Sequence, residues 1–153
     1  MEVERIMTTE PACCTPDTPL QEVARLMVEN DCGQIPVIEN AKTRRTVGVI
    51  TDRDIVCRTL AVGENPLTLT AEHVMSRPVL TVRPDTEVEE CCRLMEERQV
   101  RRAPVEDENG RCCGIVSLAD IAQNAPERMT AEVVRTVSQP GASPSGTGRN
   151  MVL

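Results

Sequence analysis

The sequence predicts an α/β fold of the α+β type, in which two tandem β-α-β-β-α repeats pack about a pseudo-twofold axis. Three observations lead to this prediction. Motifs in residues 7–37 recur 68 positions later, and Gly48 recurs 66 positions later as Gly114. Each copy has about 60 residues, which is too few to bury a stable core alone, so the two copies should pack together. We expect small mixed sheets covered by helices.

The repeat is visible in four short motifs of each copy. In the first copy these are Met7, Pro16-Asp17-Thr18, Leu26-Met27 and Pro36-Val37, and in the second copy Met75, Pro84-Asp85-Thr86, Leu94-Met95 and Pro104-Val105. The change of period falls in one polar stretch, where residues 40–45 stand against the shorter 106–110. An insertion confined to a polar stretch predicts a surface hairpin loop.

The copies give the expected boundaries. We expect repeat 1 over residues 1–64, repeat 2 with a terminal helix over residues 65–137, and a disordered tail over residues 138–153. Thr70 is expected to cap a short helical turn after the linker. The terminal helix is predicted near residues 130–134, and the tail is rich in Pro, Gly, Ser and Thr.

Each copy should begin with a strand and a helix. In the second copy a β-prone run at residues 79–82 precedes the Pro-Asp turn. A helix should then start at Thr18 or Thr86, because Gln21 and Glu89 stand at the capping-box spacing. Apolar residues follow at helical spacing, so these helices are expected to cover a sheet.

A hairpin and a second helix should complete each copy. Residues 35–38 and 46–50 are short apolar runs on either side of the polar loop. Thr51 and Ser117 then stand where a helix N-cap belongs. The closing helices are expected over residues 52–60 and 118–124.

Composition narrows the functional classes. The 153 residues include no Phe, Tyr or Trp and carry a formal charge of −7, with a pI near 4.8. Single-stranded nucleic acid is normally bound by aromatic rings above a basic groove, so we expect no nucleic-acid partner. Neither a secretory signal nor an apolar run long enough for a membrane span is found. We therefore expect a cytoplasmic protein with reduced thiols and no membrane partner.

Six of the eight cysteines stand in adjacent pairs, Cys13-Cys14, Cys91-Cys92 and Cys112-Cys113. Structural zinc sites usually space their thiolates two to four residues apart, and His73 is the single histidine. Adjacent cysteines point in different directions on a strand or a helix. The pairs are interpreted as small hydrophobic residues of the core, with a thiol-based redox or metal sensor as the alternative.

The sharpest local motif is Gly-x-x-Thr/Ser-x-x-Asp, at residues 48–54 and 114–120. A hydroxyl beside the exposed N–H groups of a helix start favours an anion. A carboxylate three residues later can accept hydrogen bonds from a ribose diol. The alternative is that both pairs are only helix caps, stabilised by the helix dipole.

Together these motifs, twice in tandem, resemble a pair of cystathionine-β-synthase (CBS) domains, the Bateman module, over about residues 3–137. The resemblance implies two clefts that bind adenosine-containing effectors such as AMP, ADP, ATP, NAD or S-adenosylmethionine. It also implies a homodimer that regulates an enzyme, channel or transporter and catalyses no reaction itself. We expect it to act in trans on an unidentified partner.

The resemblance also implies ligand-binding residues in each copy. One site would use Thr18, Ile35, Pro36, Val37, Thr51, Arg53 and Asp54. The other would use Thr86, Arg101, Arg102, Ala103, Pro104, Val105, Ser117 and Asp120. In these sets the aspartate would bind the ribose hydroxyls and the arginines would meet phosphates. No catalytic or metal-ligating residue is expected.

Overall fold

The computed structural model describes residues 1–77, 79–124 and 135–136. Its elements are η1 (Val3–Arg5), β1 (Thr8–Thr9), α1 (Leu20–Glu29), β2 (Gln34–Ile38), β3 (Thr46–Thr51), α2 (Asp52–Arg58), η2 (Leu60–Val62), η3 (Pro66–Thr68), α3 (Ala71–Val74), α4 (Val88–Arg98), β4 (Arg102–Glu106), β5 (Cys112–Ser117) and α5 (Leu118–Asn124). The fold class is the predicted α+β. The terminal helix predicted near residues 130–134 and the predicted tail at 138–153 lie outside the described residues.

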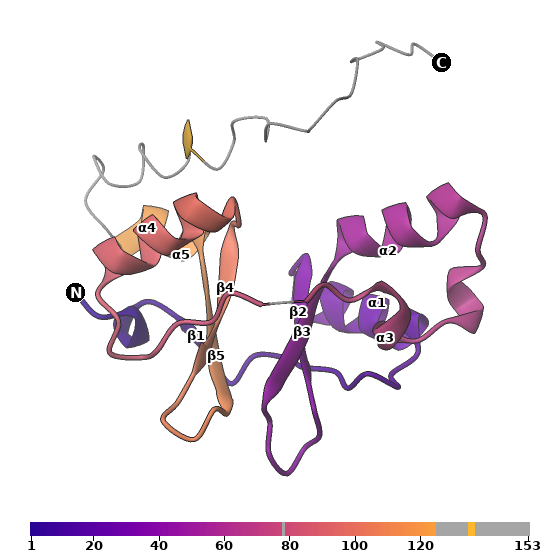
Figure 1. Cartoon of the computed structure of the whole chain (residues 1–153), viewed down its shortest axis with the longest axis horizontal. Helices are drawn as coiled ribbons and strands as arrows, with labels where there is room; N and C mark the ends of the chain where they lie inside the picture. Colours follow the sequence, from indigo (N-terminus) through magenta and orange to yellow (C-terminus); the bar gives the residue numbers. More distant parts are fainter. Residues whose placement is uncertain (78, 125–134, 137–153) are drawn as a thin grey trace.

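Two antiparallel hairpins form the centre of the molecule (Figure 1). One is the two-stranded sheet β2-β3, and the other is β4-β5, to which β1 adds to give the order β1-β5-β4. Both hairpins were predicted and both are confirmed. Their register shifts at equivalent places, between Val37 and Ile38 and between Val105 and Glu106, as expected for a duplicated unit.

The strand predicted at residues 79–82 is reduced to a single parallel bridge with β4. Val82 donates its N–H to the Pro104 carbonyl at 3.0 Å and accepts from the Glu106 N–H at 2.9 Å. The ladder ends there because Pro84 and Pro104 have no N–H to continue it. Such parallel bridges give the small sheets their mixed character.

The first helix of each copy begins two residues later than predicted, and the predicted capping boxes do not form. Neither α1 nor α4 has a side-chain cap. Instead, the Thr18 hydroxyl accepts from the Thr15 N–H and the Thr86 hydroxyl accepts from the Arg83 N–H, both at 3.0 Å. These threonines therefore close the turn before the helix.

Tertiary contacts satisfy the helix amides that the capping boxes would have served. The Leu20 N–H donates to the Leu69 carbonyl at 3.0 Å, and the Val88 N–H donates to the Met1 carbonyl at 2.8 Å. Unpaired N–H groups at a helix start need such partners. Sequence spacing could not show that a distant segment supplies them.

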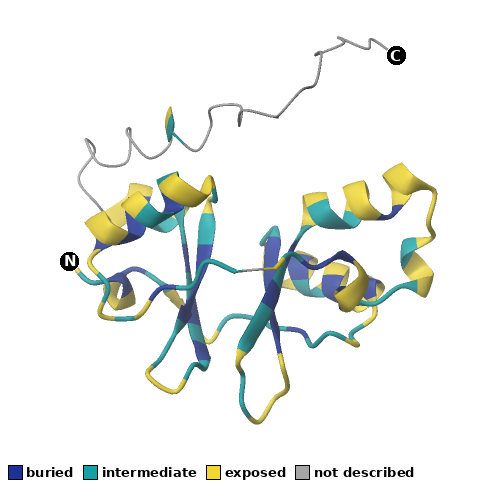
Figure 2. Ribbon diagram, viewed as in Figure 1, coloured by how far each residue is buried: buried dark blue, intermediate teal, exposed yellow. Residues whose placement is uncertain are grey.

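The two copies exchange their leading segments. The first core surrounds the β2-β3 hairpin and includes Ala71, Val74 and Met75 from the start of the second copy. The second core surrounds β4-β5 and includes Val3 and Ile6 from the start of the first. The chain therefore crosses between the halves on the way to each core (Figure 1). Buried residues lie along both hairpins, whereas the outer faces of α2 and α4 are exposed (Figure 2).

A candidate ligand cleft between the two repeats

Thr51 and Asp54 form a reciprocal cap at the start of α2. The Thr51 hydroxyl accepts from the Asp54 N–H at 3.0 Å, and Asp54 Oδ2 accepts from the Thr51 N–H at 2.9 Å. In the second copy the Asp120 N–H donates to Ser117 Oγ at 3.2 Å, and the Ser117 N–H donates to Asp120 Oδ2 at 2.7 Å. The predicted N-caps at Thr51 and Ser117 are confirmed.

The cap leaves part of the Asp54 carboxylate unused. Its second oxygen, Oδ1, lies 4.0 Å from Arg58 Nε, and the side chain remains 17% exposed. Asp54 also lines the cleft between the repeats. Capping and ligand binding therefore do not exclude each other at this residue.

The cleft between the repeats has a volume of about 800 Å³. Ligand pockets in proteins commonly have about 300–1,000 Å³, so a nucleotide-sized molecule fits. The lining comes from both hairpins, from the start of α2 and from the segment that crosses between the copies. The lining residues are Gly33, Gln34, Val49, Thr51, Asp52, Arg53, Asp54, Ser76, Val79, Leu80, Gln99, Val100, Arg101, Arg102 and Pro104.

The cleft is rich in charge of both signs. Arg53, Arg101 and Arg102 contribute guanidinium groups, and Asp52 and Asp54 contribute carboxylates. In the part of the chain that the structure describes, none of these three arginines forms an ion pair. Guanidinium groups without a carboxylate partner can bind phosphate through charge-assisted hydrogen bonds.

Gln34 is a buried polar residue of this lining that the sequence did not single out. The residue is 8% exposed and lines the cleft. Its amide makes no side-chain hydrogen bond within residues 1–77 and 79–124, so it is free to bind a ligand there. Gln34 stands 68 positions before Arg102 and so occupies the equivalent position in the first copy. This correspondence could have identified Gln34 as a site residue from the sequence.

The cleft combines residues from both predicted sets. Thr51, Arg53 and Asp54 of the first set meet Arg101, Arg102 and Pro104 of the second in one lining. The prediction had assigned the two groups to separate sites, with a ligand that bridges the two copies. They meet because the two hairpins face each other across the repeat boundary.

The other predicted residues do not line this cleft. Ile35, Val37, Ala103 and Val105 are fully buried in the cores, so only their backbone groups could meet a ligand. Pro36 lies within β2. Thr18 and Thr86 close turns, and Ser117 and Asp120 form the cap of α5. Whether these residues bind a ligand stays a prediction.

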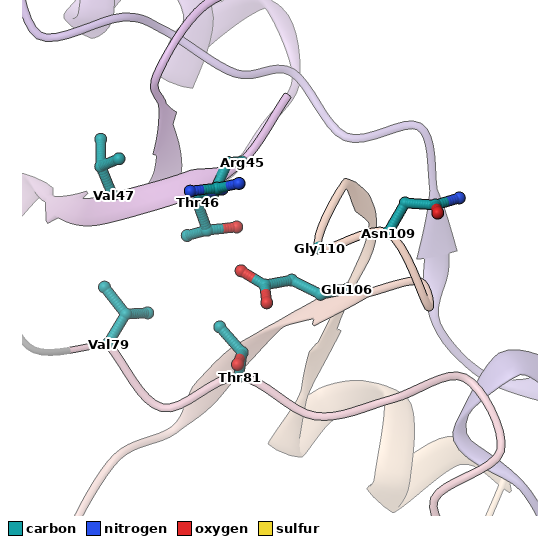
Figure 3. A pocket seen from close by; sticks show the side chains of 8 residues that line it. All are labelled: Arg45, Thr46, Val47, Val79, Thr81, Glu106, Asn109 and Gly110. Atoms are coloured by element: carbon teal, nitrogen blue, oxygen red, sulfur yellow. The ribbon is translucent and has the colours of Figure 1, made fainter. Parts of the chain in front are cut away.

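A second, smaller cleft of about 470 Å³ lies beside the hairpin loops (Figure 3). Its lining includes Thr46, Thr81, Glu106 and Gly110. The Glu106 carboxylate extends into the space below Thr46 (Figure 3). The Thr46 hydroxyl is buried and has no hydrogen-bond partner among the described residues.

The described residues contain no group of three or more His, Cys, Asp or Glu side chains that could hold a metal ion. Nor is any helix within them both long and apolar enough to cross a membrane.

The CBS domain family model matches residues 3–58 and 71–127 of the chain. An uncharacterised protein of Methanopyrus kandleri is 42% identical to this chain. The match covers 69% of this chain and 53% of that relative's length. The CBS domain-containing protein YhcV of Bacillus subtilis is 39% identical over 80% of this chain and 84% of its own length.

Two solved structures are also similar. Hypoxic Response Protein I, crystallised with two coordinated zinc ions, superposes with a TM-score of 0.73 at 36% identity, over 82% of this chain and 100% of its own. The CBS domain pair of protein MJ0100, in complex with 5′-methylthioadenosine and S-adenosyl-L-methionine, gives a TM-score of 0.71 at 25% identity, over 80% and 98%. This fold therefore holds adenosyl ligands in at least one similar protein.

Proposed function

The chain belongs to the CBS domain family, and from this membership we propose that it is a regulatory module that binds an adenosine-containing ligand between its two repeats. One observation carries the proposal. Thr51 and Asp54 at the start of α2 share a lining with Arg101 and Arg102 from the other repeat. A carboxylate and two guanidinium groups are the side chains that a ribose and a phosphate group need.

The charges in the cleft favour a phosphorylated ligand. Three arginines without an ion-pair partner in the described residues line one cleft, although the whole chain carries a net charge of −7. Such a local basic site attracts anions against the field of the chain. AMP, ADP, ATP and NAD fit this chemistry better than S-adenosylmethionine, which has no phosphate.

The proposed effect of the ligand is regulatory and not catalytic. A molecule in the cleft contacts both repeats, so it would favour one relative position of the two hairpins. A ligand shifts such an equilibrium only if it binds the two states with different affinity. The regulated partner, an enzyme or a transporter, would respond to the change in the relative position of the two hairpins.

We further propose that the module is a homodimer. Val56 in α2, Leu60 and Val62 in η2 and Leu67 in η3 are each more than half exposed. Large apolar side chains exposed on neighbouring elements favour association with another chain. Light scattering coupled to gel filtration tests the dimer, and a monomer at micromolar concentration would contradict it.

The ligand itself can be tested directly. Mass spectrometry of small molecules released from the denatured protein should identify an adenine compound, and calorimetry should then rank AMP, ATP, NAD, S-adenosylmethionine and GTP. We expect guanine nucleotides to bind at least about tenfold more weakly, which is about 1.4 kcal/mol. No binding of any adenine compound would overturn the proposed function.

A further inference from the structure

Cys13 and Cys112 are far apart in the sequence but adjacent in the structure. Cys13 lies in the extended segment that follows β1, and β1 pairs with β5. The next residue, Cys14, forms a bridge with Val37 of β2 in the first core. Cys112 is the first residue of β5 in the second core. The two residues therefore lie on segments that meet at the boundary between the repeats.

The two thiols are neighbours, because each is the largest influence on the pKa of the other. The Cys13 thiol donates to the Pro11 carbonyl at 3.3 Å, and the Cys112 thiol donates to the Gly114 carbonyl at 3.7 Å. Arg44 joins both residues, because its Nη2 lies 3.6 Å from Cys13 Sγ and its carbonyl accepts from the Cys112 N–H at 2.8 Å. Two sulfur atoms and one guanidinium group thus form a compact cluster between the repeats.

The pseudosymmetry shows that the scaffold does not require this cluster. By the repeat, the positions of Cys13 and Cys112 are taken in the other half by Thr81 and Thr46, and that of Arg44 by Gly110. These three residues line the smaller cleft (Figure 3). One half of the molecule therefore has two hydroxyls and an open space where the other half has two thiols and a cation.

We propose that Cys13 and Cys112 are a redox-active thiol pair, which a hydroperoxide converts to a disulfide that joins the two repeats. This inference goes beyond ligand binding and does not depend on it. It also differs from a sensor built on the adjacent cysteine pairs, since the partners are 99 positions apart.

The reaction needs one peroxide molecule and two thiols. The Cys13 thiolate attacks a peroxide oxygen, the O–O bond breaks, and a proton completes the departing water or alcohol, which leaves a sulfenic acid. The Cys112 sulfur then attacks the Cys13 sulfur, the S–O bond breaks, and the hydroxyl leaves with the Cys112 proton as water. The thiols lose two electrons and the peroxide gains them.

The surroundings assign the two roles. The neighbouring Cys112 thiol, followed by the positive charge of Arg44, lowers the pKa of the Cys13 thiol below its usual value, against the effect of burial. The neighbouring Cys13 and burial raise the pKa of Cys112. Cys13 is half-buried and within reach of a small oxidant, whereas Cys112 is buried. Cys13 is therefore the attacking thiolate and Cys112 the resolving thiol.

The other cysteines offer controls within the same chain. Cys14 and Cys91 are buried, and burial raises the pKa of each thiol to about 12, so both should react slowly. Cys57 is exposed on α2 and should react without forming an internal disulfide. Threonine at position 13 or 112 has a precedent in the other half of the molecule, so both variants should fold.

The test is peptide mapping of the reduced full-length protein after addition of about one equivalent of hydrogen peroxide. We expect a Cys13–Cys112 cross-linked peptide, reversed by dithiothreitol, in the wild type and in Cys57→Ser. In Cys112→Thr, Cys13 should stop at the sulfenic acid and be trapped by dimedone. In Cys13→Thr, Cys112 should stay reduced.

A different disulfide, or a Cys13 that reacts no faster than Cys91 with iodoacetamide in the untreated protein, would overturn the proposal. The wild-type map requires no substitution, so the proposal remains testable even if a variant fails to fold. Because no nucleotide is added, failure of this experiment would leave the proposed ligand function untouched.

Discussion

Gly114 of β5 lies against Met7, which precedes β1 on the segment that crosses from the other repeat. A Cβ added to Gly114 would stand 2.5 Å from Met7 Sδ and 3.2 Å from the Thr8 carbonyl oxygen. The equivalent contact joins Gly48 and Met75, with 2.8 Å to Sδ. In both halves a glycine thus makes room for the exchanged segment.

Replacing Gly114 or Gly48 should therefore weaken the packing of the exchanged segment against the strand. Gly114→Ala should destabilise the protein by about 1–3 kcal/mol, because overpacking forces neighbours to move. Gly48→Ala should cost less, since all three of the nearest atoms there belong to the flexible Met75 side chain. Urea unfolding of both variants measures the difference. If the contact is the cause, Met7→Ala should recover part of the loss in a double-mutant cycle, and strict additivity would contradict it.

The arginines of the second repeat should discriminate by ligand charge. Replacing Arg101 and Arg102 together by alanine should weaken ATP binding at least about tenfold, because charge-assisted hydrogen bonds to phosphate are lost. Adenosine binding should change little. Calorimetry with both ligands tests this, and Arg98→Ala, which removes a charge at the end of α4 outside the cleft lining, is the control. Equal losses for ATP and adenosine would show that the pair does not meet phosphate.

Asp54→Asn separates binding from capping. We expect a loss of affinity in the cleft, because charge-assisted hydrogen bonds contribute about 1.5–3 kcal/mol, and a stability cost of at most about 1 kcal/mol from the weakened cap. Asp120→Asn changes the matching cap outside this cleft. It should cost similar stability and leave the affinity of this cleft unchanged. Intact binding by Asp54→Asn alongside a lower melting temperature would make the carboxylate only a cap.

The buried thiols should make the protein sensitive to alkaline pH. Burial raises the pKa of Cys14 and of Cys91 to about 12. Unfolded thiols ionise near pH 8.5, so above that pH the folded state holds more protons and stability falls as pH rises, by up to about 1.4 kcal/mol per pH unit for each thiol. This loss should continue to about pH 12.

Urea unfolding under reducing conditions between pH 7.5 and 10 measures that slope. The chain has no tyrosine and one lysine, Lys42, so cysteines dominate titration in this range. Cys91→Ala should reduce the slope, and Cys57→Ser, at an exposed position, should not. A stability independent of pH over this range would contradict the prediction.

Local sequence patterns were enough to predict the separate elements and their duplication. The hairpins at β2-β3 and β4-β5 follow from apolar runs on either side of polar loops, and the caps at Thr51 and Ser117 follow from a hydroxyl at a strand end. Both signals act within a few residues, so they are legible without the tertiary structure. The same holds for the buried cysteines of α4, which follow the helical period.

Which copy each leading segment packs against could be seen only in the folded chain. The N–H groups of Leu20 and Val88 bond to carbonyls of Leu69 and Met1, so distant segments replace the predicted capping boxes. The packing of the two hairpins brings Arg101 and Thr51 into the lining of one cleft, whereas the sequence assigned them to two separate sites. It also makes Cys112 a neighbour of Cys13, 99 positions away. The hydrophobic period of an element predicts which of its faces is buried. The element that packs on that face depends on contacts between distant residues, and a local pattern does not predict those contacts.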